Sequence, residues 1–291
     1  MPCSDRYLRR ILATKSYQPM PTPWRFLNTP PARGSWNMAV DEAILESTTR
    51  GDVPPTLRLF TWQPACLSLG YAQPVADVDR QRLAQHGWDL VRRPTGGKAI
   101  LHTDELTYSV TGPQTEPRLA GSVLESYRRL STALLKALHL LGIPAQSQAD
   151  VLHHDNEPKG PVCFEVPSNY EITVEGKKLI GSAQARRREG VLQHGTLPLH
   201  GDLTRITAVL AFPDEAGRSL AAARLIRRAT TAEIILGYLL DWDTVAHAFA
   251  TAFEQALDLD LTPASLTTTE SKRAAELEQE KYSHPSWTDR V

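Results

Sequence analysis

A cysteine and a lysine with complementary chemistry lie fifteen residues apart in the middle of the chain. Cys163 precedes an alternating segment that ends at Gly176 and is followed by Lys177 and Lys178. The thiolate of cysteine is a nucleophile, and a nearby ammonium group lowers the pKa of the thiol. A strand, a tight turn and a second strand would bring Lys178 back toward the sulfur. This order predicts an enzyme that holds an acyl group on Cys163 and passes it to an amine.

Both residues also have an ordinary structural interpretation. A lone cysteine is most often buried and unreactive, and a lysine in a turn is most often exposed. Side chains alternate between the two faces of a strand, so Lys177 and Lys178 are expected to point in opposite directions. We expect Lys178, the lysine nearer to the apolar residues that follow, to point inward as a donor to an acyl carbonyl oxygen.

A second candidate site is the segment at residues 92–99, which reads RRPTGGKA. Two glycines let the backbone approach a ligand closely, and basic side chains flank them, so the turn suits an acyl carbonyl or a phosphate. Its spacing matches neither a phosphate-binding P-loop nor the dinucleotide fingerprint. An ordinary hairpin turn with solvated arginines would account for the same residues.

Other candidate residues have weaker signals. His102 and His194 stand at the ends of expected strands, where either orients a loop or makes a structural hydrogen bond. Cys66 lies in an alternating segment without a neighbouring lysine motif, which favours a buried, unreactive thiol. The run HHD at residues 153–155 lacks the spacing of metal ligands, so we expect no metal site.

The composition argues against several classes of protein. The 291 residues carry 32 Lys and Arg against 33 Asp and Glu, a net charge of −1 that gives no reason to expect binding to nucleic acid or membranes. Three widely spaced cysteines argue against a disulfide framework and favour a reducing compartment. The sequence contains no run of eighteen apolar residues, and its first residues do not resemble a secretory signal, so we expect a cytoplasmic protein.

The elements that must position these residues mix strands and helices. Residues 56–62 and 66–71 alternate and predict a hairpin. Ser35 is a candidate cap for the helix that follows it, and Ser122 with Glu125 forms a capping box before a long amphipathic helix. Because strands occur in antiparallel-looking pairs, we expect an α+β fold. We divide the chain into an N-terminal arm (1–23), a catalytic domain (24–258) and a polar, largely helical tail (259–291), which we expect to be solvated or partly ordered.

Taken together, the motifs resemble a known family. Its matching stretches are NMAVDE (37–42), RRPTGGKAILH (92–102), ELTYSV (105–110), GKKLIGSAQ (176–184) and the closing KYSHPSW (281–287). The first four of these, separated and in the right order, are together more specific than any one of them. The chain resembles the lipoate–protein ligase and octanoyltransferase group, whose fold is that of the biotin protein ligases and class II aminoacyl-tRNA synthetases.

Within this group, the segment around Cys163 resembles the single-domain, cysteine-dependent octanoyltransferases. The resemblance implies a mixed, mostly antiparallel sheet flanked by helices. It implies transfer of octanoate from acyl carrier protein to a lysine of a lipoyl domain, such as that of the glycine-cleavage H protein, without a cofactor. It assigns Cys163 and Lys178 as catalytic residues. It also implies a set of substrate-binding residues from two segments, namely Arg93, Thr95, Gly96, Gly97, Lys98, His102, Gly181, Ser182 and Ala183.

Three other functions remain open from the sequence. An ATP-dependent lipoate or octanoate ligase, which uses ATP and Mg²⁺, would keep the fold and Lys178 but leave Cys163 idle. Lys98 stands where ligases tend to have a small residue, which favours a transferase. An amidotransferase would move octanoate between lipoyl domains, also through a thiol. A catalytically silent module would bind lipoyl domains or acyl groups without forming a covalent adduct.

Overall fold

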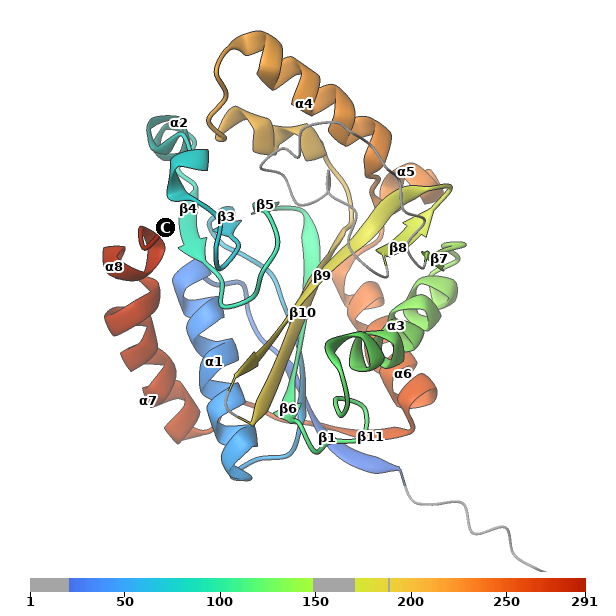
Figure 1. Cartoon of the computed structure of the whole chain (residues 1–291). Coiled ribbons are helices and arrows are strands. Elements are labelled where there is room, and N and C mark those ends of the chain that lie inside the picture. Colours follow the sequence, from blue (N-terminus) through green and yellow to red (C-terminus); the bar gives the residue numbers. More distant parts are fainter. Residues whose placement is uncertain (1–20, 149–170, 188) are drawn as a thin grey trace, which may run out of the picture.

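The computed structural model describes residues 21–148, 171–187 and 189–291, and two sheets organise them (Figure 1). The main sheet has eight strands in the order β11-β1-β2-β6-β10-β9-β8-β7, and a small sheet has the order β4-β3-β5. The strands of the main sheet are β1 (Thr22–Asn28), β2 (Thr56–Phe60), β6 (Glu105–Pro113), β7 (Gln146–Gln148), β8 (Glu171–Val174), β9 (Lys177–Arg187), β10 (Gly190–Pro198) and β11 (Leu259–Pro263), and those of the small sheet are β3 (Cys66–Leu69), β4 (Asp89–Arg92) and β5 (Ile100–His102).

Most neighbouring strands run antiparallel. The exceptions are β1 with β11, β1 with β2, and β3 with β4, which run parallel. Two pairs of helices flank the main sheet, α1 with α7 and α3 with α6 (Figure 1). The helices are α1 (Gly34–Arg50), α2 (Arg80–Gln85), α3 (Val123–Leu140), α4 (Glu215–Arg228), α5 (Ala232–Leu236), α6 (Trp242–Leu257), α7 (Thr268–Leu277) and α8 (Pro285–Thr288). The expected α+β fold with a mixed, mostly antiparallel sheet is confirmed.

Helix α3 shows how local sequence and packing agree. The predicted capping box is confirmed, because Ser122 Oγ accepts from the Glu125 N–H and the Glu125 carboxylate accepts from the Ser122 N–H. The buried face repeats at helical spacing through Leu130, Leu134 and Leu138, which join the core beneath the main sheet. Burial of each leucine stabilises the fold by roughly 1.5–3 kcal/mol.

Two local predictions are wrong. Ser35 does not cap α1, since the cap position is Arg33 and Ser35 Oγ instead donates to Glu278 Oε1 at 2.6 Å. The segments 56–62 and 66–71 do not form a hairpin, because β2 pairs with β1 and β6 while β3 pairs with β4 and β5. Each strand pairs on both edges with segments distant in the sequence, and alternation within one segment does not indicate those partners.

Residues 259–291 are largely helical, as expected, but they are not a solvated tail. Strand β11 extends the main sheet beside β1, and α7 packs on α1. Glu270 is fully buried and forms an ion pair with Arg25 at 2.6 Å. The segment's few apolar side chains, including Ala274 and Leu277, fall on one helical face and join the core around α1. The boundaries after residues 23 and 258 stay predictions. Among the described residues, no helix is both long and apolar enough to cross a membrane.

Candidate active site

A cavity of about 450 Å³ lies where the small sheet meets the main sheet. This volume falls in the range that binds small ligands. Its walls come from α1, the small sheet and the turn between β4 and β5, the start of α3, and strands β9 and β10. Much of its lining is apolar, including Met38, Trp62, Ile100, Val123 and Leu124. The cavity can therefore accept an apolar chain, and its lining also includes polar side chains.

The structure brings most of the predicted substrate-binding residues into this wall. Nine residues of the predicted catalytic and substrate-binding set line the cavity, namely Arg93, Gly96, Gly97, Lys98, His102, Lys178, Gly181, Ser182 and Ala183. Thr95 does not line it, but its Oγ1 lies 2.6 Å from Nε2 of His194, which does. Cys163 lies outside the described residues. The chemical roles of all these residues stay predictions.

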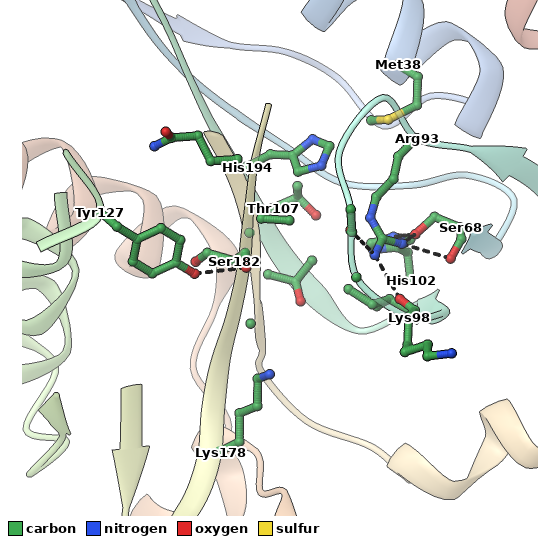
Figure 2. Close-up of a pocket in the computed structure, with 18 of the residues that line it drawn as sticks. Met38, Ser68, Arg93, Lys98, His102, Thr107, Tyr127, Lys178, Ser182 and His194 are labelled. Carbon is green, nitrogen blue, oxygen red and sulfur yellow. Dashed lines mark hydrogen bonds between the residues drawn. The ribbon is translucent and has the colours of Figure 1, made fainter. Parts of the chain in front are cut away.

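Buried arginines hold the turn between β4 and β5. Arg93 donates through Nη1 to the carbonyl and hydroxyl oxygens of Ser68, at 3.0 and 3.1 Å, and through Nη2 to the carbonyls of Gly96 and Lys98, at 2.7 and 2.8 Å (Figure 2). Arg92 is fully buried and Arg93 nearly so. An ordinary turn with solvated arginines is therefore excluded, and Arg93 fixes the shape of the turn.

The turn also needs glycine at particular positions. Gly97 has a φ of +93°, a conformation that favours glycine. A side chain at Gly70 would place its Cβ 1.9 Å from the Gly97 carbonyl oxygen, so the small sheet and the turn touch directly. The backbone N–H groups of Gly96, Gly97 and Lys98 donate no hydrogen bond to any residue in the described part of the chain. These groups can bind the oxygen of a ligand.

Lys178 reaches the cavity from strand β9 (Figure 2). Its side chain is only 3% exposed, whereas Lys177 is half-buried. Its Nζ donates to Oε1 of Glu171 at 2.8 Å, across the β8–β9 pair. A buried ammonium requires such a partner, because desolvation of an isolated charge is costly. The cavity thus presents a buried cation on one wall and the β4–β5 turn on another.

A second buried ion pair, between Asp41 and Arg58, lies next to His194, which lines the cavity. Asp41 Oδ1 lies 2.7 Å from Arg58 Nη1 and accepts from Ser109 Oγ at 2.8 Å. Asp41 Oδ2 lies 3.5 Å from Nδ1 of His194. Burial would raise the pKa of Asp41, but the Arg58 charge and His194 outweigh it and lower that pKa. Burial lowers the pKa of His194, so its imidazole is neutral at pH 7 and links Asp41 to Thr95.

His102 belongs to a similar chain of hydrogen bonds. Its Nδ1 lies 2.6 Å from Glu105 Oε1, its Nε2 lies 2.8 Å from Ser68 Oγ, and its ring stacks on Trp62 with centroids 4.0 Å apart. Trp62 donates to Thr107, which donates to the same Glu105 oxygen. Both ring nitrogens have protein partners, which agrees with a structural histidine, and the substrate-binding role of His102 stays a prediction.

Sequence reasoning missed Tyr127 of α3, which lines the cavity and donates to the Ser182 carbonyl at 2.8 Å. Outside the lining, Tyr108 lies 2.7 Å from Ser182 Oγ. Burial raises the pKa of Tyr108 to about 12, so it remains a neutral phenol. Burial also raises the pKa of the Cys66 thiol well above its ordinary value, which agrees with the expected unreactive cysteine. No motif pointed to Tyr127, because its helix is separate from the segments that carry the predicted site residues.

Metal chemistry has no evident location in the described residues. Within residues 21–148, 171–187 and 189–291, no three His, Cys, Asp or Glu side chains cluster as metal ligands. The expectation of a metal-free, cofactor-free enzyme stays a prediction.

Comparisons with known proteins agree with this architecture. A family model described as the lipoyl protein ligase A/B catalytic domain matches residues 33–254. An octanoyltransferase LipM from Kyrpidia tusciae is 41% identical over 92% of this chain and 98% of its own length. An octanoyltransferase LipM from Symbiobacterium thermophilum is also 41% identical, over 93% of this chain and 100% of its own.

Solved structures lead to the same family. The bi-partite lipoate protein ligase of Thermoplasma acidophilum superposes with a TM-score of 0.75 at 27% identity, covering 93% of this chain and 97% of that one. A lipoate-protein ligase A bound with ATP gives a TM-score of 0.73 at 27% identity, covering 93% and 99%. The resemblance seen in the motifs is confirmed, and the chain belongs to the lipoyl protein ligase A/B catalytic domain family.

Proposed function

We propose that this protein transfers an octanoyl group from acyl carrier protein to the target lysine of a lipoyl domain, through a thioester on Cys163. The observation that carries the proposal is the cavity, with its apolar lining, the buried Lys178 and the N–H groups of the β4–β5 turn, which bond to no acceptor among the described residues. The two relatives at 41% identity, which match more than nine-tenths of the chain, are named octanoyltransferases.

The first step forms the acyl-enzyme. The Cys163 thiolate attacks the thioester carbonyl, a new carbon–sulfur bond forms, the bond to the carrier sulfur breaks, and the carrier leaves as a thiol after taking up a proton. Lys178 and the N–H groups of Gly96, Gly97 and Lys98 stabilise the negative charge that develops on the carbonyl oxygen. The apolar wall binds the hydrocarbon tail. Each buried methylene contributes roughly 0.8 kcal/mol, so the depth of the cavity selects chain length.

The second step releases the product. The neutral amine of a lipoyl-domain lysine, such as that of the glycine-cleavage H protein, attacks the same carbonyl. A carbon–nitrogen bond forms, the bond to Cys163 breaks, the amine loses a proton to solvent, and the thiolate is regenerated. Conversion of a thioester to an amide is favourable, so the reaction requires neither ATP nor Mg²⁺.

Intact-protein mass spectrometry tests this function. Wild-type protein mixed with octanoyl-acyl carrier protein, with no nucleotide present, should gain one octanoyl group that hydroxylamine removes. Cys163→Ala should gain none, and Cys66→Ala, which changes a buried thiol, should behave as wild type. Activity that requires ATP and free acid, without an adduct, would instead show an ATP-dependent ligase. An adduct formed only from octanoylated lipoyl domains would show an amidotransferase. Binding without any adduct would show a silent module.

A further inference from the structure

A second cavity, of about 670 Å³, adjoins the acyl cavity. Four residues line both spaces, namely Gly96, Gly97, Lys98 and Gln184. The remaining wall of the second cavity is formed by Tyr71, Ala72, Gln73, Pro94, Ala185, Arg186 and Arg187. This lining holds three cationic side chains and no carboxylate. A ligand whose reactive end occupies the acyl cavity can therefore continue past the turn into a basic space.

Two guanidinium groups flank Tyr71 at this cavity. Arg187 lies 5.0 Å from the centroid of the Tyr71 ring, and Arg290 lies 4.0 Å from it. Both also approach Trp287, at 5.8 and 5.0 Å, and Trp287 packs edge-on against Tyr71. Stacking on aromatic rings orients a guanidinium group while its N–H groups remain able to donate.

Among the described residues, no acid neutralises the positive charge at the second cavity. Within the described part of the chain, neither Arg187 nor Arg290 forms an ion pair with a carboxylate, and Arg187 makes only a long 3.3 Å hydrogen bond to the Pro94 carbonyl. Nearby acids are already engaged, since Asp289 pairs with Arg80 and Glu42 with Lys281. A hydrogen bond from Arg290, together with the charges of Arg290 and Arg187, lowers the pKa of the exposed Tyr71 hydroxyl.

We infer that Arg187, Arg290 and Tyr71 bind the phosphate of the arm that carries the acyl thioester, so that the second cavity is the phosphate site of the donor. The inference rests on the proposed function. Guanidinium groups match phosphate with paired, charge-assisted hydrogen bonds. The second cavity shares the β4–β5 turn with the acyl cavity. One ligand can therefore place its thioester in the acyl cavity and its anion in the second cavity. An acyl group joined by a phosphopantetheine arm to a carrier has this combination of apolar tail, thioester and anion.

The test compares two small donors that differ only in the phosphate. We expect octanoyl-4′-phosphopantetheine to octanoylate the wild-type protein about tenfold faster, or more, than octanoyl-pantetheine at low salt, since the donor without phosphate loses its charge-assisted hydrogen bonds to the guanidinium groups. In the double variant Arg187→Ala/Arg290→Ala, the ratio of the two rates should fall to about one. The matched control Arg50→Ala, an exposed arginine at the end of α1, should keep the wild-type ratio. If the double variant does not fold, Arg290→Ala alone serves, with a smaller fall in the ratio.

The outcomes separate this inference from the proposed function. Equal rates for the two donors on the wild-type protein, or an unchanged ratio in the double variant, would overturn the phosphate site while leaving the transferase intact. No octanoyl adduct from any thioester would refute the transferase itself. Octanoyl-acyl carrier protein should lose the same factor as the free arm, which identifies the carrier-bound phosphate as the source. A loss with the carrier alone would place the arginines against acidic side chains of the carrier and overturn the phosphate assignment.

Discussion

Substitution of Asp41 by asparagine should destabilise the protein by about 3–5 kcal/mol, because it leaves a buried guanidinium without its counterion. Asp41 is fully buried and Arg58 is 1% exposed, and their closest atoms lie 2.7 Å apart. Arg58 also donates to the side chain and carbonyl of Asn37, but neither carries charge. Burial already lowers the pKa of Arg58, which shows how poorly this environment tolerates the charge. A loss of this size is a large part of a typical stability of about 5–15 kcal/mol.

Urea unfolding at neutral pH measures the effect, with the slope of the transition checked for a change in the unfolded state. Asp52→Asn is the matched control, because Asp52 also pairs with an arginine, Arg50, but both side chains are at least half-exposed. Solvent screens such a pair, and we expect its loss to cost less than about 1 kcal/mol. The double variant Asp41→Asn/Arg58→Met should lose less stability than the sum of its single changes. A loss below about 1 kcal/mol for Asp41→Asn, or simple additivity in the double variant, would show that the buried pair is not coupled as argued.

Three further predictions concern residues in and around the cavity. Gly70→Ala should lower the rate of octanoyl transfer at least tenfold while leaving the far-ultraviolet circular dichroism unchanged, because the new Cβ would lie 1.9 Å from the Gly97 carbonyl oxygen and displace the turn; a change below twofold would contradict this. Burial lowers the pKa of His194, so below pH of about 6.5 the unfolded chain binds a proton that the folded chain does not. Stability is thus retained above that pH and lost below it, and urea unfolding at neutral and mildly acidic pH should show a smaller loss for His194→Gln than for the wild type. Burial raises the pKa of Cys66, so iodoacetamide should modify this thiol only after unfolding, as peptide mass mapping will show, and modification of the native protein would refute the assignment.

The sequence predicted best those parts of the site that lie in continuous motifs. Arg93 and Gly97 share one turn, and Lys178 and Ser182 share one strand, so local spacing placed each set correctly with respect to its own backbone. Alternation along a strand also distinguished Lys178, which is buried, from Lys177, which is half-buried. These features depend on local geometry, which a single segment specifies.

The rest of the site depends on contacts between distant segments. Asp41 and His194 are 153 positions apart, and no periodicity indicates that one supports the other. The incorrect hairpin has the same origin, since alternation identifies a strand but not its partners. After residue 258 polar residues outnumber apolar ones, so the composition did not indicate that a few side chains, such as Leu277, pack into the core.

The attachment of the C-terminal segment has a consequence for the chemistry. Arg92 donates to the Thr288 carbonyl at 2.9 and 2.7 Å, and Trp287 donates back to the Arg92 carbonyl at 2.8 Å. Arg92 is adjacent to Arg93, which holds the β4–β5 turn. The last residues of the chain are therefore connected through two consecutive arginines to the backbone that we expect to stabilise the reacting carbonyl. Because Arg290 follows directly after this attachment, the same contacts that order the turn also position a cation beside the second cavity. Acyl binding and recognition of the donor's anion would thus both depend on the contacts between Arg92 and the C-terminal residues.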